Sequence, residues 1–306
     1  MRVVVAIVGF RNADDIKLCL SRLAASTYTN FEVVICENGG PAAFAELSSA
    51  VPPQLKSGQS VTLIEAPANL GYAGGVNTCL QASPDADAWW VLNPDTEPHC
   101  RALAALAARL AIGDVAAVGG VLHDERGRVQ NLGGRWRAWL GRSESIGHGC
   151  DLAALPALTE VEQQLGFLSG ASMLIGRALT ARIGLMREDY FLYAEELEWF
   201  VRARAAGLRL GFAPEARVLH HQGSTTGSGA ARKAKARLPV YLETRNALHV
   251  VRDTTPRWLL NAAAAAPVLL AARYARAGAW RQYRWALEGV AAALRNERGP
   301  PPWLRL

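Results

Sequence analysis

The feature that most constrains the fold of this chain is an alternation of apolar runs and helix-like stretches over its first 121 residues. The apolar runs are rich in β-branched residues and bounded by polar ones, as in strands buried on both faces; they lie at 3–8, 31–36, 61–66, 88–92 and 115–121. Stretches with helical spacing lie between them, at 16–23, 42–50, from about residue 75, and at 100–110. This order predicts an α/β fold with a mostly parallel, Rossmann-like sheet and helices on both faces.

Residues 122–166 interrupt this alternation. They contain Gly-Gly and Asp/Arg turns, followed by a stretch with weak periodicity. Irregular segments of this length inside a compact domain are more often functional loops than filler, so we expect a functional loop here. The chain has 306 residues, of which 50% are hydrophobic, and can bury a large core. We predict one large domain, residues 1–253, and a C-terminal extension, residues 254–306.

The cysteines and the N-terminus both indicate a cytoplasmic protein. The five cysteines are scattered, mostly within apolar segments, and have no C-x-x-C spacing, so we expect them to be reduced core residues; they are Cys19, Cys36, Cys79, Cys100 and Cys150. The apolar N-terminus is followed by Asp14 and Asp15, where a secretion signal would need small residues for cleavage. A first strand is therefore favoured over a signal peptide.

Charge is distributed unevenly along the chain. Residues 1–200 have a net charge of −7 and residues 201–306 one of +13, which together give the overall +6. A basic C-terminal third predicts an anionic partner, and the candidate classes are a membrane surface, diphosphate groups or nucleic acid.

One carboxylate is placed where α/β proteins bind ligands. The apolar run 88–92 is followed by Asn93-Pro94-Asp95. Pro94 cannot donate to a strand ladder and pushes Asn93 toward extended or turn geometry, so Asp95 lies just past the carboxyl end of the strand. A carboxylate there could hold a divalent cation. The alternative is a helix N-cap for the alanine-rich stretch that follows.

Polar and small residues also gather at the other predicted strand ends. They include Phe10 after the first strand, Glu37 and Asn38 after the second, and Asn69, Gly71 and Asn77 after the third. Glycines there let the backbone approach a ligand, and a helix starting at this point directs amide groups at a phosphate. Neither a G-x-G-x-x-G fingerprint nor a P-loop is present. A simple tight turn is the alternative.

Two further groups of residues could carry chemistry. Glu195 and Glu196 are predicted in the first turn of a helix, after an aromatic-rich loop. Acidic residues are favoured at that position by the helix dipole alone, but the number of glutamates here exceeds what capping needs, so we expect one to be catalytic. His220 and His221 end a later strand and precede a Gly/Ser/Thr stretch at 223–227. A histidine at a strand end is a candidate metal ligand.

The order of these motifs resembles that of the inverting glycosyltransferases of family 2, which have the GT-A fold, and is closest in style to rhamnosyltransferase-like enzymes of bacterial polysaccharide assembly. The resemblance covers residues 3–252. It rests on Asn93-Pro94-Asp95, similar to the Asp-x-Asp metal motif, on Glu37-Asn38, on the spacing of Asn69, Gly71 and Asn77, on Glu195-Glu196 in place of a Glu-Asp pair, on His220, and on Tyr241 with Arg245-Asn246.

This resemblance implies roles for the residues. Asp95 would bind Mg²⁺ or Mn²⁺ at the donor diphosphate, and His220 would be a second ligand. Glu196 would be the catalytic base, with Glu195 as the alternative. The donor-binding residues would be Phe10, Glu37, Asn38, Asn69, Gly71, Asn77, Asn93, Asp95 and Arg245. We expect Arg245 and the basic residues at 232–237 to close over the diphosphate and exclude water.

The implied partners are a nucleotide-diphosphate sugar, with UDP or dTDP as the nucleotide and rhamnose as one candidate sugar, and a glycan or polyprenyl-diphosphate-linked acceptor; no nucleic acid is implied. Two other functions stay open. A nucleotidyltransferase should have a Gly-rich loop with Arg and Lys where this chain has Gly9-Phe10-Arg11-Asn12-Ala13. A non-catalytic nucleotide-sugar-binding partner of another transferase is harder to exclude, because Glu195-Glu196 replaces the usual pair.

The C-terminal extension lies beyond the resemblance. Its apolar run, 258–272, contains Asn261 and Pro267 and is expected to fall short of the ~20 residues that span a bilayer. The following stretch has an apolar, Trp-rich stripe beside a basic one, which predicts an amphipathic helix; the stripes are Trp280, Tyr283, Leu287, Val290 and Leu294, and Arg281, Arg284, Glu288 and Arg295. We expect this helix either to attach peripherally to the inner face of the cytoplasmic membrane or to pack on its own domain or in a homodimer.

Overall fold

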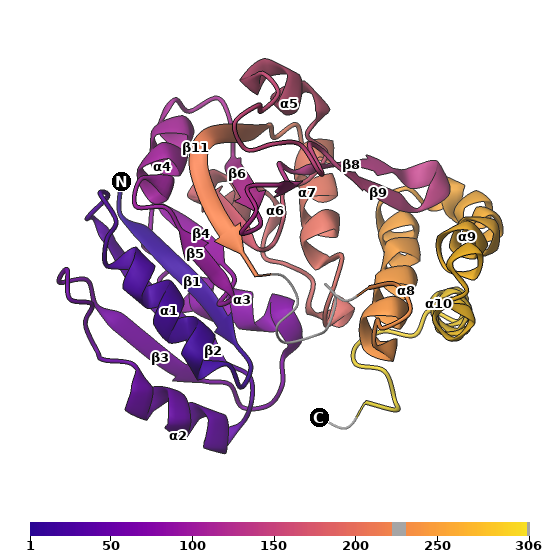
Figure 1. The fold of residues 1–306 in the computed structure, drawn as a ribbon, viewed down its shortest axis with the longest axis horizontal. Helices are drawn as coiled ribbons and strands as arrows, with labels where there is room; N and C mark the ends of the chain where they lie inside the picture. Colours follow the sequence, from indigo (N-terminus) through magenta and orange to yellow (C-terminus); the bar gives the residue numbers. More distant parts are fainter. Residues whose placement is uncertain (222–230, 305–306) are drawn as a thin grey trace.

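The computed structural model describes residues 1–221 and 231–304 of the chain; the Gly/Ser/Thr stretch at 223–227 therefore lies outside the described residues. Within them, a nine-stranded sheet forms the centre of the molecule, in the order β3-β2-β1-β4-β10-β6-β11-β5, with β7 paired to β6 (Figure 1). Its strands are β1 (Val3–Gly9), β2 (Phe31–Glu37), β3 (Val61–Glu65), β4 (Ala88–Leu92), β5 (Thr96–Pro98), β6 (Ala117–His123), β7 (Val129–Asn131), β10 (Ser172–Gly176) and β11 (Leu210–His220).

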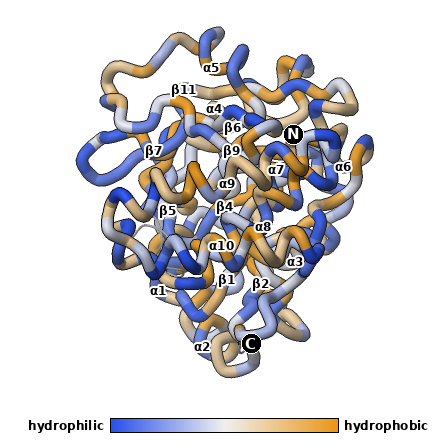
Figure 2. The backbone as a smooth tube through the Cα atoms, turned by 90° about the vertical axis from the view of Figure 1, so that its right-hand side faces the viewer, coloured by the Kyte–Doolittle hydropathy of each residue, from blue (hydrophilic) through white to orange (hydrophobic). Residues whose placement is uncertain are grey.

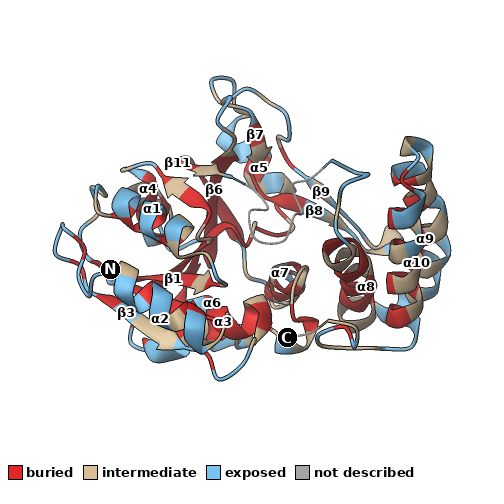
Figure 3. Cartoon of the chain, turned by 60° about the horizontal axis from the view of Figure 1, so that its bottom comes forward, coloured by how far each residue is buried: buried red, intermediate tan, exposed pale blue. Residues whose placement is uncertain are grey.

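Alternation along the strands divides the core between the two faces of the sheet. In β1, Val3, Val5 and Ile7 face one hydrophobic cluster, whereas Val4 and Ala6 face the other. Both sets are buried because helices cover both faces, as Figure 3 shows for the red central strands. The first cluster includes side chains from α1 (Ala13–Leu23), α2 (Pro41–Ala50) and α4 (Ala102–Ala111); the second includes side chains from α3 (Gly71–Ala82), α6 (Arg177–Ile183) and α7 (Glu195–Ala205).

The structure confirms the α/β class, but the sheet is mixed. Strands β3, β2, β1 and β4 are all parallel, as predicted. β10 runs antiparallel to both of its neighbours, β4 and β6. The reason lies in the connection: β10 follows the irregular segment after β6, and no helical crossover returns the chain to the same end of the sheet.

The segment 122–166 contains more regular structure than its sequence indicates. It includes β7, an antiparallel hairpin of β8 (Gly134–Arg137) and β9 (Arg142–Ser145) closed by the 3₁₀ turn η1 (Ala138–Leu140), and α5 (Leu158–Gln164). The hairpin reaches the C-terminal helices, where Asn261 Nδ2 donates to Trp139 O at 2.7 Å.

Three helices form the C-terminal end: α8 (Arg237–Thr254), α9 (Leu259–Arg273) and α10 (Trp280–Leu294). They share a hydrophobic cluster to which α8 contributes Val240, Leu248 and Val251. Gly289 lets α10 approach α8 closely, since a Cβ there would lie 2.5 Å from Tyr241 O. α8 thus spans the predicted boundary at residue 253, while the predicted helical extension is present beyond it.

One expectation about this extension is wrong. Pro267 lies inside α9 without ending it, and 3₁₀ turns η3 (Pro256–Trp258) and η4 (Ala275–Ala277) extend the helical stretch to 22 residues, Pro256–Ala277. By length and composition this stretch could cross a membrane, and 17% of its most apolar window is buried. Figure 2 looks onto this side of the molecule. The exposed large apolar residues of α9 and α10 are Leu260, Val268, Trp280 and Leu294.

The cysteines are free, as expected. Cys19, Cys36 and Cys79 are buried, whereas Cys100 and Cys150 are half-buried.

Candidate active site

Asp95 and His220 lie together at the end of two strands. Asp95 is 7% exposed and sits between β4 and β5, and His220 is the last residue of β11, which pairs with β5. Their side chains approach to 3.5 Å between Asp95 Oδ1 and His220 Nε2. The backbone fixes the same corner, because His221 N donates to Asp95 O at 3.0 Å.

Gln130 of β7 determines which nitrogen of His220 carries the proton. Its Nε2 donates to His220 O at 2.9 Å, so its Oε1 is the atom that faces His220 Nδ1 at 3.0 Å. An amide oxygen only accepts, and His220 Nδ1 must therefore donate. In the neutral ring this leaves a lone pair on Nε2, the atom that faces the carboxylate of Asp95. Two electron-rich atoms held this way suit a cation between them.

His221 points elsewhere. Its ring nitrogens pair with Glu97 Oε1 at 2.8 Å and Glu125 Oε1 at 3.4 Å. Among the described residues no group of three or more His, Cys, Asp and Glu side chains could hold a metal. A divalent ion at Asp95 and His220 would take its remaining ligands from a diphosphate and water, which is how Mg²⁺ is commonly bound.

The end of β2 supplies the next predicted residues. Glu37 is 1% exposed, and its Oε1 accepts from Gly39 N at 2.7 Å and Arg11 N at 3.0 Å. The space beside it is tight: a Cβ on Gly9 would lie 2.4 Å from Glu37 Oε2, so the Glu37 side chain would have to shift. Asn38 ties this edge to the next one: its Nδ2 donates to Gly71 O at 2.8 Å.

Four more predicted donor residues have local partners. Asn69 Oδ1 accepts from Gly71 N at 3.0 Å, and Phe10 N donates to Asn12 Oδ1 at 2.9 Å. Asn93 pairs through its backbone, with Asn93 N donating to Ala171 O at 3.0 Å. The sequence-based donor roles of these residues stay predictions.

Asn77 of α3 is buried, and its amide binds the loop that precedes α7. Its Nδ2 donates to Met186 O at 2.9 Å and to Glu188 Oε1 at 2.8 Å, while its Oδ1 accepts from Met186 N at 3.1 Å. These contacts attach α3 to the loop that precedes α7.

Gly170 connects the start of α7 with the phenol of Tyr72, because its backbone also binds the carboxylate of Glu196. Tyr72 Oη donates to Gly170 O at 2.5 Å. Burial and then the negative charges of Glu196, Glu195 and Asp95 raise the pKa of this phenol well above its usual value, so all three carboxylates act on one hydroxyl. Tyr72 thus lies beside Gly170, which belongs to the stretch of small residues before β10.

The environments of the two glutamates differ. Glu195 is 2% exposed, and its Oε2 has no hydrogen-bond partner among the described residues. Burial and the neighbouring Glu196 raise its pKa well above the usual range. Glu196 is more exposed; burial raises its pKa, while backbone amide donors, including that of Gly170, act to lower it. Both carboxylates are therefore poor acids and better bases than ordinary glutamates.

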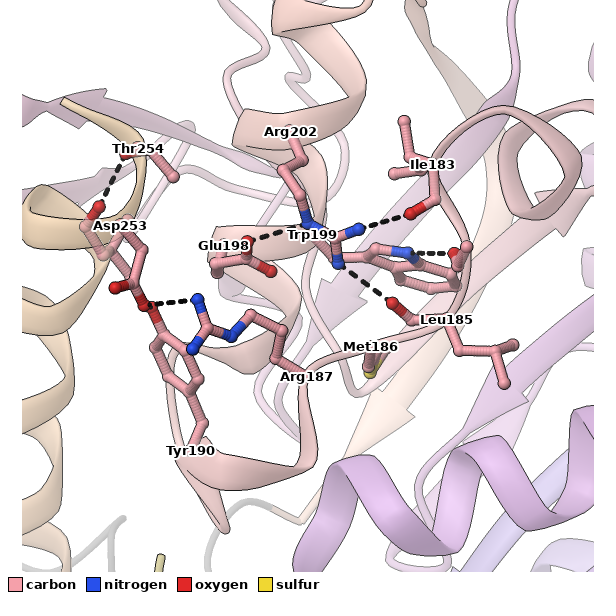
Figure 4. Close-up of polar contacts among 12 residues, drawn as sticks. Ile183, Leu185, Met186, Arg187, Tyr190, Glu198, Trp199, Arg202, Asp253 and Thr254 are labelled. Carbon is pink, nitrogen blue, oxygen red and sulfur yellow. Dashed lines mark hydrogen bonds and ion pairs between the residues drawn. The ribbon is translucent and has the colours of Figure 1, made fainter. Parts of the chain in front are cut away.

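The loop before α7 is fixed by α7 itself and by α8 (Figure 4). Arg202 pairs with the buried Glu198 at 2.7 Å and donates to Leu185 O at 2.9 Å. Trp199 Nε1 donates to Gly184 O at 2.9 Å. On the other side, Tyr190 Oη donates to Asp253 Oδ2 at 2.8 Å.

Arg245 is buried in the described structure. It is 1% exposed, its Nε donates to Asn246 Oδ1 at 2.9 Å, and its Nη2 donates to Tyr190 O at 3.3 Å. Two residues of the basic stretch 232–237 are also in ion pairs, Lys235 with Glu243 at 3.5 Å and Arg237 with Glu288 at 2.8 Å. Closure of these residues over a diphosphate stays a prediction.

Sequence reasoning assigned no role to three residues that shape this site. Tyr72 lies in the Gly-rich run, and an aromatic residue among glycines is a usable signal. Gln130 has no such signal in the sequence, because it lies 90 residues away from His220, the residue that it contacts. Asn246 is part of the Tyr and Arg-Asn motif, but only the structure shows what it contacts.

A family model described as "Glycosyltransferase like family 2" matches residues 1–238. The chain belongs to this family. Among curated relatives of the glycosyltransferase is the "Low-salt glycan biosynthesis hexosyltransferase Agl10" of Haloferax volcanii, 25% identical over 221 residues, or 71% of this chain and 66% of that protein. The alignment thus spans just under two thirds of the length of Agl10. An "N-acetylglucosaminyl-diphospho-decaprenol L-rhamnosyltransferase" of Mycobacterium tuberculosis is 26% identical over 246 residues, covering 74% of this chain and 78% of that one.

Solved structures share the fold of this glycosyltransferase. The mannosyltransferase PcManGT from Pyrobaculum calidifontis, in complex with GDP-Man and Mn²⁺, superposes with a TM-score of 0.58 at 17% identity, over 97% of this chain and 88% of that one. GalNAc-T7 with UDP, GalNAc and Mn²⁺ gives 0.56 at 14% identity, over 81% and 51%. The enzyme therefore has the GT-A fold with a C-terminal helical region.

Proposed function

We propose that the enzyme transfers a sugar, with rhamnose as one candidate, from a nucleotide diphosphate to a hydroxyl of a glycan or polyprenyl-diphosphate-linked acceptor, with inversion at the anomeric carbon. The observation that supports this proposal is that two adjacent residues join the parts of the candidate site: Gly170 binds the Glu196 carboxylate and Tyr72 Oη, and Ala171 O accepts from Asn93 N, two residues before Asp95. A leaving diphosphate needs positive charge beside it and an attacking hydroxyl needs a base, and we assign these tasks to a cation at Asp95 and His220 and to a glutamate of α7.

In this mechanism Glu196 is the base, because it is the more exposed member of the pair and its raised pKa makes it a stronger base than an ordinary glutamate. It takes the proton of the acceptor hydroxyl as the oxygen attacks the anomeric carbon. The bond to the diphosphate oxygen breaks on the opposite face, and a single displacement inverts the carbon. Glu195 is buried beside Glu196. Because two neighbouring carboxylates repel each other, the pair favours a state in which one of the two carboxyl groups is protonated.

Asp95 and His220 Nε2 would hold Mg²⁺ or Mn²⁺, which would neutralise charge on the leaving diphosphate as a Lewis acid. UDP and dTDP are the nucleotides we propose, at the edge formed by Glu37, Asn38 and Asn69. The relatives' names support this class of reaction: one contains a diphospho-decaprenol acceptor, and PcManGT was solved with a nucleotide sugar and Mn²⁺.

We propose peripheral attachment of the C-terminal helices to the inner face of the cytoplasmic membrane, where a lipid-linked acceptor resides. On α9, Leu260 is 80% and Val268 72% exposed, and they lie eight residues apart, on one helix face. On the opposite side Ala262, Ala266 and Leu270 are buried in the cluster shared with α8 and α10. Exposed arginines at 257, 273 and 276 suit anionic lipid.

The test is a donor screen with UDP-, dTDP- and GDP-sugars, with and without Mn²⁺, on a polyprenyl-diphosphate-linked acceptor. Transfer with an inverted anomeric centre supports the proposal. Metal-dependent nucleotide binding without transfer from any donor would instead favour a non-catalytic binding partner. In calorimetric titration, Asp95→Asn should lose the metal-dependent part of nucleotide affinity; equal metal dependence in the variant and the wild type would remove Asp95 from the site.

A further inference from the structure

The loop that leads into α7 has an unusual backbone. Phe191, Tyr193 and Ala194 have φ values of 68°, 72° and 67°, within four consecutive residues. None of them is glycine, and L-residues adopt positive φ at a cost in conformational energy. Ala194 is the N-cap of α7, so this conformation sets the direction in which the helix begins and where Glu195 and Glu196 point. A loop of this kind persists only when its surroundings determine it fully.

Each carbonyl oxygen from Tyr190 to Ala194 accepts a hydrogen bond, and the donors include groups of α3, α7 and α8. On the α3 side, Tyr72 N donates to Phe191 O at 2.8 Å, and Gly71 lets the chains approach, since a Cβ there would lie 2.0 Å from that oxygen. On the α7 side, Glu198 N donates to Ala194 O at 3.0 Å.

The three other carbonyls lie around the side-chain amide of Asn246, whose two N–H groups are shared among them; Tyr190 O also accepts from Leu192 N at 2.9 Å and from Arg245 Nη2 at 3.3 Å. Asn246 Nδ2 lies 3.0 Å from Tyr190 O, 2.9 Å from Leu192 O and 2.8 Å from Tyr193 O. Its Oδ1 accepts from Arg245 Nε at 2.9 Å, which fixes the orientation of the amide. Asn246 is fully buried, so these bonds do not compete with water.

We propose that Asn246 is a positioning residue for the catalytic glutamates: by binding the carbonyls of Tyr190, Leu192 and Tyr193 it holds the loop in its positive-φ conformation. This role rests on the proposed function, since it matters for catalysis only if Glu195 or Glu196 is the base. It touches no substrate and acts through the loop.

The helix that carries Asn246 is itself fixed by the C-terminal end of the chain. His249 Nε2 contacts Glu297 O at 2.9 Å, Arg252 Nη2 donates to Ala293 O at 2.9 Å, and Arg298 pairs with Asp253 at 2.7 Å. The same Asp253 accepts from Tyr190 Oη at the start of the loop. The C-terminal helices and the base are thereby parts of one connected structure.

The experiment compares Asn246→Ala and Asn246→Asp with Val251→Ala. Val251 is fully buried on the same helix but belongs to the cluster with α9 and α10, so its truncation loosens packing without touching the loop. Transfer kinetics are combined with hydrogen–deuterium exchange of the peptide covering 188–196. Because a misplacement of about 1 Å can cost ~10²-fold in rate, we expect kcat to fall ~10²-fold in both Asn246 variants, with donor KM nearly unchanged.

Exchange in 188–196 should become faster in both Asn246 variants and stay unchanged in Val251→Ala. Adding Ala194→Gly to Asn246→Ala should restore part of kcat, because glycine adopts positive φ without the strain. If Asn246→Asp does not fold, Asn246→Ala decides. A kcat within threefold of wild type, an equal loss in Val251→Ala, or unchanged exchange would each overturn the proposal. The two claims can fail separately. A wild type that transfers no sugar refutes the proposed function, whereas hydrogen–deuterium exchange needs no substrate and still tests whether Asn246 holds the loop.

Discussion

Gly71 offers a quantitative test of how tightly the loop before α7 is held. Gly71 has φ 70°, and a Cβ added there would lie 2.0 Å from Phe191 O, whereas real Cβ atoms stay beyond 3.0 Å. Gly71→Ala therefore carries two separate costs. The positive φ costs about 1–2 kcal/mol for an L-residue. The overlap forces the loop back by at least about 1 Å, which breaks the Tyr72 N–H bond to Phe191 O and removes about another 0.5–1.5 kcal/mol.

Gly127 is the matched control. Its φ is 71°, and a Cβ there would have no atom within 4 Å, so Gly127→Ala pays for the backbone conformation alone. Urea denaturation should give a loss of about 1–2 kcal/mol for Gly127→Ala and about 1.5–3.5 kcal/mol for Gly71→Ala. Because the shift occurs at the residues that precede Glu195, turnover should fall ~10²-fold in Gly71→Ala only. Equal stability and equal turnover in the two variants would refute the close approach of α3 to this loop.

Three further outcomes are expected. Glu196→Gln should lower kcat ~10²-fold or more and abolish the acid limb of the pH profile of kcat/KM. In the wild type the midpoint of this limb should lie above the usual glutamate pKa of about 4.3, because burial raises the pKa of Glu196. A larger effect from Glu195→Gln would exchange the roles of the two residues. The folded-state pKa of Glu195 is raised, so ionisation of Glu195 destabilises the fold as pH rises. Above about pH 4.3, Glu195→Gln should therefore be increasingly more stable than the wild type in denaturation series at several pH values. A stability difference between the two proteins that does not change with pH would contradict this. Leu260→Glu with Val268→Glu should reduce sedimentation with anionic liposomes at low salt while leaving activity on a detergent-dispersed acceptor intact; unchanged sedimentation would exclude this face of α9.

The sequence predicted best what local patterns determine. The β-branched runs of β1 and β2 identify buried strands without any long-range information, whereas β3, predicted in the same way, lies at the edge of the sheet and is buried only at Val61. Asp95 follows from a proline that ends its strand. The direction of β10 does not follow from such patterns, because the hydrophobic pattern of a strand is the same whether it pairs parallel or antiparallel to its neighbours. Its direction depends on a connection of nearly fifty residues whose path no local signal determines.

In the candidate site, too, the sequence predicts the features that local patterns determine and misses the others. Glu195 and Glu196 could be placed at a helix start because acidic residues there have a known physical reason. The conformation that orients them could not, because Phe191, Tyr193 and Ala194 are residues for which a positive φ is not expected. The burial of Arg245 behind the loop has no local signal either, because arginine is rarely buried; its donor role stays a prediction.

The connection between α8 and the chain's end also determines how a membrane role can be tested. Truncation at Asp253 would remove α9 and α10, but it would also remove Glu297 and Arg298, which bind His249 and Asp253. It would expose the apolar cluster that α8 shares with both helices. A truncated enzyme would therefore lose turnover through the loop before α7, whether or not the helices touch lipid. Substitutions on the exposed face of α9 avoid this, since Leu260 and Val268 make no part of that core.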